Sequence, residues 1–189
     1  MGSSIQAILN RVYLVYFLIH IPILFCVDLV PFYPSSLWEP AGSPFHALGE
    51  LRSYYYTTYN DQFFLPSASS SSSYQIPTFF PLFAFLELVF HLPVSVWAVR
   101  ALWTGDLAKG KGSAELLLLV YGLETALTTA TCMYEAALWD PSVVTWDQKV
   151  VLVGGLYGGY FALAAILSVD MYTRLLSRVN AVDAVKKTQ

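Results

Sequence analysis

The stretch from Pro77 to Arg100 constrains the fold most. It is long and apolar enough to cross a bilayer, yet it carries Glu87 and His91 near its middle. The two residues are four positions apart and therefore share one face of a helix. An ionisable side chain at membrane depth costs roughly 2.5–3.5 kcal/mol on insertion scales and usually faces a bundle interior. The pair therefore indicates either a functional site or a polar contact that holds two helices together.

Three further apolar runs have about the length of a membrane span: Val12–Val30, Ala114–Leu138 and Val150–Tyr172. The first run is long for a cleaved signal peptide, and no small-residue cleavage motif follows it closely, so we interpret it as a retained helix. The chain is 56% hydrophobic and only 12% charged, whereas soluble domains have about 25% charged residues. The sequence therefore predicts an all-α membrane protein, a bundle of four transmembrane helices.

Charge, cysteines and motifs exclude several functions. The net charge of −3 offers no electrostatic footprint for nucleic acid, so we expect no nucleic-acid partner. Both cysteines, Cys26 and Cys132, lie in apolar runs, which excludes a multi-disulfide scaffold and a cysteine-rich metal site. There is no G-x-S-x-G, P-loop or H-E-x-x-H motif to support hydrolysis or phosphoryl transfer. We expect no cofactor.

The third apolar run carries four polar residues at spacings of four, three and four: Glu124, Thr128, Thr131 and Glu135. This spacing places them on one stripe of a helix. Since polar groups at membrane depth avoid lipid, we expect the whole stripe to face the bundle.

The fourth run contains two overlapping G-x-x-x-G pairs, Gly154 with Gly158 and Gly155 with Gly159. Glycines at this spacing let a second helix approach closely. We therefore expect these positions to mediate helix packing and to have no role in chemistry.

Residues 31–76, between the first two runs, predict a long loop. They are rich in proline, serine and tyrosine, and they include a serine-rich tract at residues 67–73. Such a low-complexity tract cannot build a core, so we interpret it as a loop insertion. The aromatic residues around Tyr54–Tyr59 are expected to pack at the membrane interface.

With four spans, both termini lie on one side of the membrane. Of the ten lysines and arginines, eight sort to that side, and the positive-inside rule therefore predicts cytosolic termini and a lumenal first loop. In the final KKTQ sequence, Lys186 and Lys187 resemble a dilysine signal for retrieval to the endoplasmic reticulum. Asp28 lies toward the lumenal end of the first span, within reach of a loop carboxylate such as Asp61.

Three motifs together resemble the sigma-2 receptor family. They are YFLIHIPILFCVDL in the first span, Asn60-Asp61 before the second, and ELVFHLP within it. That family shares the EXPERA domain with the emopamil-binding sterol isomerases. The resemblance covers residues 11–175, with the tract 67–73 as an insertion and residues 176–189 as a cytosolic tail. It implies a small endoplasmic-reticulum membrane protein with a ligand cavity inside its helix bundle.

The resemblance also implies ligand-binding residues. Asp28, which closes the first-helix motif, would hold the cationic amine of a ligand, and Asp61 would support it. Two close carboxylates repel, so we expect one to keep a proton and hydrogen-bond the other. Glu87 matches the glutamate of the second-helix motif, while His91 stands where the family often has glutamine.

Two more features complete the candidate set. Tyr157 and Tyr160 resemble tyrosines of the family's fourth helix. Glu124 departs from the receptor pattern and leaves the identity of the ligand open. The candidate ligand-binding residues are therefore Asp28, Asp61, Glu87, His91, Glu124, Tyr157 and Tyr160.

Three classes of function are compatible with the sequence. The first, which we favour, is a non-enzymatic protein of sterol homeostasis or trafficking that binds sterols, other lipids or hydrophobic cationic amines. A dry aromatic cavity would hold them through charge pairing and cation–π contacts. The second is a sterol double-bond isomerase, whose acid and base Glu87, His91 and Glu124 would supply. The third is a structural helper of other membrane proteins, and a homodimer is also compatible with the sequence.

Overall fold

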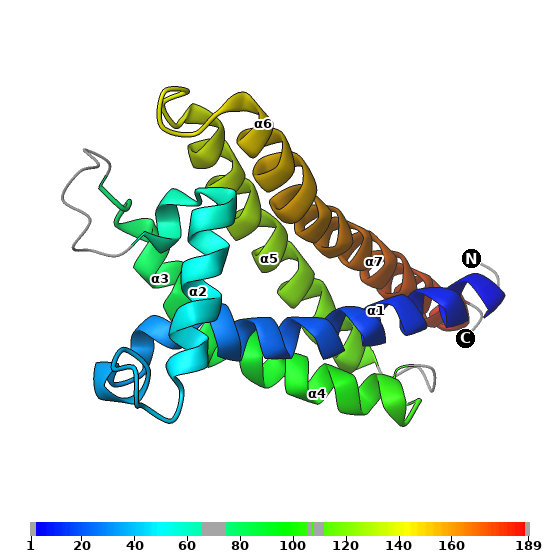
Figure 1. Ribbon diagram of the computed structural model, residues 1–189. Helices are drawn as coiled ribbons and strands as arrows, with labels where there is room; N and C mark the ends of the chain where they lie inside the picture. Colours follow the sequence, from blue (N-terminus) through cyan, green and yellow to red (C-terminus); the bar gives the residue numbers. More distant parts are fainter. Residues whose placement is uncertain (1–2, 66–74, 106, 108–111, 188–189) are drawn as a thin grey trace.

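The computed structural model describes residues 3–65, 75–105, 107 and 112–187 (Figure 1). Within these ranges the chain is helical and forms no strand. Four helices are long and apolar enough to cross a membrane: Ser4–Asp28, Phe79–Trp103, Gly112–Leu138 and Trp146–Lys186. The predicted all-α fold with four spans is therefore confirmed. The serine-rich tract at residues 67–73 lies outside the described residues.

The spans are built from the following elements. The first contains α1 (Ser3–Ile23) and η1 (Leu24–Asp28), and the second contains α3 (Phe79–Leu86), η5 (Glu87–His91) and α4 (Leu92–Trp103). The third is α5 (Gly112–Leu138), and the fourth contains α6 (Trp146–Lys149), η6 (Val150–Tyr157) and α7 (Gly158–Lys186). Between the first two spans lie η2 (Val30–Phe32), η3 (Ser35–Leu37), α2 (His46–Tyr59) and η4 (Gln62–Phe64).

In the described ranges, π-helical turns interrupt the first, second and fourth spans at η1, η5 and η6. Pro93 gives a reason for η5, because its missing amide hydrogen leaves the carbonyl of Val89 without its regular helical partner. In η6 the adjacent Gly154 and Gly155 weaken the regular helix. Such π-helical turns occur frequently at functional sites.

The segment predicted as a long loop contains a helix, so that prediction was wrong for residues 46–59. α2 contacts η1 at the end of the molecule opposite the termini (Figure 1). It ends at Asn60, whose left-handed conformation (φ 56°) lets its amide bond to the carbonyl of Tyr56 at 2.8 Å. This turn directs the next residues, 61–64, into the protein interior.

The spans pack in two pairs, α1 with α4 and α5 with α7. Figure 1 shows the N- and C-termini side by side at one end of the molecule. The buried apolar residues form two clusters. One, toward the termini, includes Tyr13, Phe17, Leu118, Tyr121, Leu167 and Met171. The other, toward α2, includes Phe63, Cys132, Ala136, Trp139 and Leu152.

The polar stripe predicted for the third span does not face the bundle as a whole. Thr131 is exposed, while Glu124, Thr128 and Glu135 are half-buried. The buried face of α5 instead follows Leu118, Tyr121, Gly122, Thr125, Thr129, Cys132 and Ala136. Gly122 lies on this buried face, where α5 packs against Ala164 and Ser168 of α7.

The expected role of the G-x-x-x-G pairs in helix packing holds only at Gly158 within the described structure, where an added Cβ would lie 4.0 Å from Cε of Met133 in α5. A Cβ added at Gly154, Gly155 or Gly159 would meet no described atom within 4 Å. By contrast, a Cβ at Gly122 would lie 2.5 Å from Oγ of Ser168. Three of the four glycines, Gly154, Gly155 and Gly159, thus border open space in the described structure.

Candidate ligand cavity

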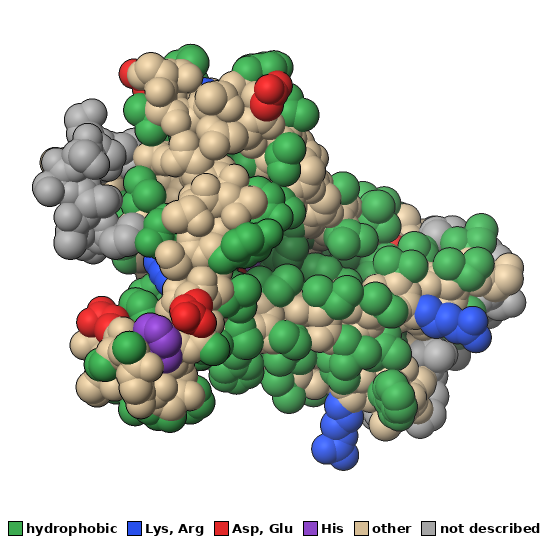
Figure 2. Space-filling model, viewed as in Figure 1, with side chains coloured by type: hydrophobic (Ala, Val, Ile, Leu, Met, Phe, Trp, Pro, Cys, Tyr) green, Lys and Arg blue, Asp and Glu red, His purple; other side chains and the backbone are tan. Residues whose placement is uncertain are grey.

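A cavity of about 760 Å³ lies among the four spans, between the two apolar clusters. This volume is within the range of about 300–1,000 Å³ that is typical of small-molecule pockets. Its walls are mostly apolar, and Figure 2 shows a hollow lined by apolar side chains on this face of the molecule. The cavity is therefore suited to a largely apolar ligand.

Five of the seven candidate residues line this cavity: Asp28, Glu87, His91, Tyr157 and Tyr160. The other two, Asp61 and Glu124, lie behind the wall. Each of these contacts a lining residue, since Asp61 bonds to Tyr157 and Glu124 bonds to His91. The fold thus brings all seven residues to one site, with five on the cavity wall and two in contact with that wall from behind.

Asp61 is completely buried. Its Oδ2 accepts hydrogen bonds from the hydroxyls of Tyr157 at 2.8 Å and Tyr55 at 2.9 Å, and its Oδ1 accepts one from the backbone N–H of Phe63 at 3.0 Å. Burial raises the pKa of Asp61 to about 6, although these three hydrogen bonds favour the charged form and act in the opposite direction. The carboxyl group therefore titrates close to neutral pH.

Arg52 supplies positive charge at this end of the cavity, and sequence reasoning missed it. Its guanidinium donates to the backbone carbonyls of Val27 at 3.2 Å and Phe64 at 3.4 Å, and it lies 5.1 Å from the centre of the Phe64 ring. Burial lowers the pKa of Arg52, while the charges of Asp28 and Asp61 act against that shift. One available signal was that Arg52 is the single lysine or arginine between positions 31 and 76.

The expected hydrogen bond between Asp28 and Asp61 is absent from the described structure. The oxygens of Asp61 are already occupied by two phenols and a backbone amide. The two carboxyl groups interact electrostatically, and both interact with Arg52. The positive charge of Arg52 therefore acts against the repulsion between the two carboxyl groups.

His91 and Glu124 form a second polar pair, deeper in the bundle. Oε2 of Glu124 contacts Nε2 of His91, and Oγ1 of Thr125 lies 3.4 Å from the same nitrogen. Nδ1 of His91 is buried and has no hydrogen-bond partner among the described residues. Glu87 lies close enough to interact electrostatically with Glu124. Carboxyl and imidazole groups in such an arrangement can exchange protons.

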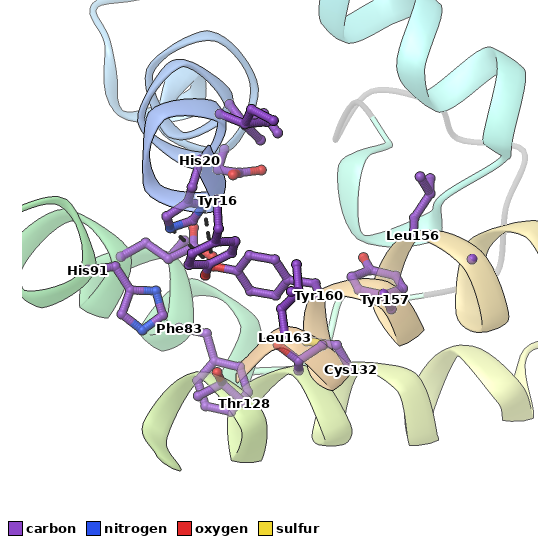
Figure 3. A pocket seen from close by; sticks show the side chains of 18 of the residues that line it. Tyr16, His20, Phe83, His91, Thr128, Cys132, Leu156, Tyr157, Tyr160 and Leu163 are labelled. Carbon is purple, nitrogen blue, oxygen red and sulfur yellow. Dashed lines mark hydrogen bonds between the residues drawn. The ribbon is translucent and has the colours of Figure 1, made fainter. Parts of the chain in front are cut away.

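The aromatic wall near the middle of the cavity includes His20, which was not in the candidate set. The hydroxyl of Tyr160 lies 3.1 Å from Nε2 of His20, and Figure 3 shows Tyr160 reaching from α7 toward α1. Tyr16 stacks on His20, with ring centroids 5.5 Å apart, and its hydroxyl lies 3.1 Å from that of Tyr121. These rings offer π faces to a bound cation and hydrogen bonds to a bound hydroxyl.

No group of three His, Cys, Asp or Glu residues in the described ranges is placed to hold a metal ion. The chemical features of the cavity are therefore carboxyl groups at one end, imidazoles and phenols near the middle, and apolar walls throughout. This arrangement can bind an amphiphile or move a proton.

Comparison with known protein families gives a match over most of the chain. The model described as EXPERA (EXPanded EBP superfamily) matches residues 47–171. The matched range begins in α2 and ends in α7, so it contains Asp61, Glu87, His91 and Glu124 but not Asp28. A search of curated proteins found no match.

Proposed function

We propose that this chain, which belongs to the EXPERA family (the EXPanded EBP superfamily), binds a sterol or another lipid, and hydrophobic cationic amines, in its intramembrane cavity. The observation that carries the proposal is the position of the carboxyl groups. Asp28 lies on the wall of an apolar cavity of about 760 Å³, and Asp61 lies directly behind Tyr157. A large apolar ligand with a single cation matches this distribution of charge.

The middle of the cavity supports binding of a neutral lipid such as a sterol. His20 and Tyr160 offer hydrogen-bonding groups on otherwise apolar walls. A sterol needs only one such partner for its hydroxyl group, and the rest of its surface is apolar. Both ligand classes therefore fit one cavity and use different polar groups. We expect such a protein to act in sterol homeostasis or trafficking.

Charge removal at Asp28 tests the amine site. Asp28→Asn keeps the size of the side chain, so we expect the folded variant to lose tight binding of a tertiary amine and to keep binding of a neutral sterol. Asp147→Asn is a matched control, because Asp147 is an exposed aspartate in α6 on the same side. The measurement is radioligand displacement, with thermal stability as a check of folding. Wild-type amine affinity in a folded Asp28→Asn protein would refute the assignment.

One observation favours a second function, a sterol double-bond isomerase. That reaction needs an acid that protonates a carbon and a base that removes a neighbouring proton. The contact between His91 and Glu124, with Glu87 on the same cavity wall, places three proton-carrying groups together. We rank this function below binding.

A third function, as a structural helper of other membrane proteins, makes a different prediction. Mass spectrometry of lipids that copurify with the chain distinguishes it from the other two. A recurring sterol supports the binder or the isomerase, whereas reproducible absence of any small molecule supports the helper. As part of the proposal we place the protein in the endoplasmic-reticulum membrane, with both termini in the cytosol.

A further inference from the structure

The cavity continues from its carboxyl end toward the end of the molecule that holds the termini. Its wall on α1 follows one helical stripe of apolar residues, Val12, Val15, Ile19 and Ile23. These side chains keep 40–57% of their surface exposed. The stripe ends at Arg11, 17 residues before Asp28, which corresponds to about 25 Å at the helical rise. The cavity is therefore a long groove beside the first span.

The opposite wall of this groove, on η6 and α7, is shallow. Gly155 and Gly159 line it, and a Cβ added at either position would meet no described atom within 4 Å. Leu156 and Leu163 complete this wall. The missing side chains leave room for a linear apolar chain between α1 and α7, in the region where Figure 2 shows the apolar hollow.

Arg11 carries a charge that no described residue neutralises. It is exposed and lines the groove, and its guanidinium has no hydrogen bond or ion pair within the described ranges. The arginines of α7 differ, because each is paired at 2.6 Å: Arg174 with Asp170, and Arg178 with Glu115. An unpaired arginine at the edge of an apolar groove complements an amphiphile with an anionic headgroup.

We propose that the Arg11 end of this groove binds an anionic glycerophospholipid from the leaflet on the side of the termini. The phosphate accepts hydrogen bonds from Arg11, which offers a planar set of donors that matches phosphate oxygens. One acyl chain lies along Val15 and Leu163, in the space that Gly159 leaves open.

The length of an acyl chain separates this site from the carboxyl end. Half of the hydrocarbon core is about 15 Å, which is about ten residues of helical rise. A chain that starts at Arg11 therefore ends near His20 and Tyr160, short of Asp28. The lipid site is thus distinct from the amine site and does not rest on the proposed function.

Native mass spectrometry of the full chain tests the site. The protein is delipidated in detergent and incubated with equimolar phosphatidylserine and phosphatidylcholine. We expect the wild type to retain one phosphatidylserine preferentially, and Arg11→Gln to lower the ratio of the two bound lipids by about fivefold. Arg11→Lys keeps the charge and should keep most of the preference. Arg100→Gln is the matched control, because Arg100 is exposed near the end of α4 and does not line the groove.

A second variant tests the groove itself. Gly159→Leu fills open space, so the protein should fold and lose the bound phosphatidylserine while Arg11 is intact. An unchanged lipid ratio in Arg11→Gln, or an equal loss in Arg100→Gln, would overturn the site. Amine binding by Arg11→Gln should equal that of the wild type, which separates failure of this site from failure of the amine site.

Discussion

The hydroxyl of Tyr157 lies 2.8 Å from Oδ2 of Asp61, a residue 96 positions earlier in the chain. Tyr157 lines the cavity from η6, whereas Asp61 is buried behind it in the turn that follows α2. Tyr55 donates a second hydrogen bond to the same oxygen from α2. Two phenol hydroxyls, one from α2 and one from η6, thus donate hydrogen bonds to the carboxylate of Asp61. Tyr157 is in contact both with this carboxylate and with the cavity.

Removal of this hydroxyl should weaken amine binding. In Tyr157→Phe, Asp61 loses a hydrogen bond that favours its charged form, so its pKa should rise above about 6. We expect amine affinity at pH 7 to fall by about tenfold, since hydrogen bonds to charged groups contribute roughly 1.5–3 kcal/mol. Radioligand displacement measures the change, and Tyr54→Phe, at an exposed position of α2, is the control. Equal affinities for Tyr157→Phe and the wild type would contradict the role of this bond.

The pKa of Asp61 also predicts a pH dependence. Burial raises it from 3.8 to about 6, so the carboxylate is charged above pH 6 and neutral below it. Attraction to a cation is therefore present at pH 7 and lost as the pH falls through 6. For a quaternary-amine ligand, which does not titrate, we expect affinity to fall by up to about tenfold per pH unit below 6. In an Asp61→Asn protein the affinity should not fall in this way as the pH is lowered. If the fall persists in that variant, another group is responsible for it.

Sequence alone predicted the number of spans, because the bilayer requires about 20 apolar residues for each. It did not predict α2, since the run of tyrosines and threonines in residues 54–59 has low helix propensity and no apolar periodicity. Contacts with η1 stabilise this helix in the structure. Asn60 was an available signal, because asparagine readily adopts the left-handed conformation that ends a helix.

The structure brings the seven candidate residues together at one cavity, but the sequence did not predict their detailed geometry. The motif match identified Asp28 and Asp61, but no sequence pattern records which donors occupy the oxygens of a buried carboxylate. Arg52 was missed for the same reason, since its guanidinium acts through tertiary contacts. The π-helical turns leave little trace in composition, although Pro93 marks one of them.

Gly122 should be the position in α5 that is most sensitive to a larger side chain. A Cβ there would lie 2.5 Å from Oγ of Ser168 and 3.0 Å from the carbonyl oxygen of Ala164. We expect Gly122→Ala to separate α5 from α7 and to destabilise the protein by about 1–3 kcal/mol, the usual effect of overpacking. Gly159→Ala is the matched control, because its Cβ would enter open space. Thermal unfolding in detergent measures the stability of both variants. Equal stability of the two would refute the close approach of α5 to α7 at Gly122.

Because a single span separates α2 from the N-terminus, we expect the two to lie on opposite sides of the membrane. The excess of basic residues on the side of the termini predicts that this side is the cytosol. In sealed microsomes, an N-terminal tag should therefore be cleaved by added protease. A cysteine at the exposed position Tyr54 should react with a membrane-impermeant maleimide only after permeabilisation. A protected N-terminal tag would invert the orientation.

We expect the purified protein to have no sterol double-bond isomerase activity, because His91 is poorly placed to exchange protons with a ligand. Its Nε2 is engaged by Glu124 and Thr125, and its Nδ1 is buried. The measurement is conversion of a sterol substrate by the purified protein, together with growth of a sterol-isomerase-deficient strain that expresses it. Growth of that strain would prove the expectation wrong. In that case Glu87→Gln should reduce the rate by roughly 10²–10⁴, the usual contribution of a general acid or base, while Glu50→Gln, at an exposed position of α2, should not.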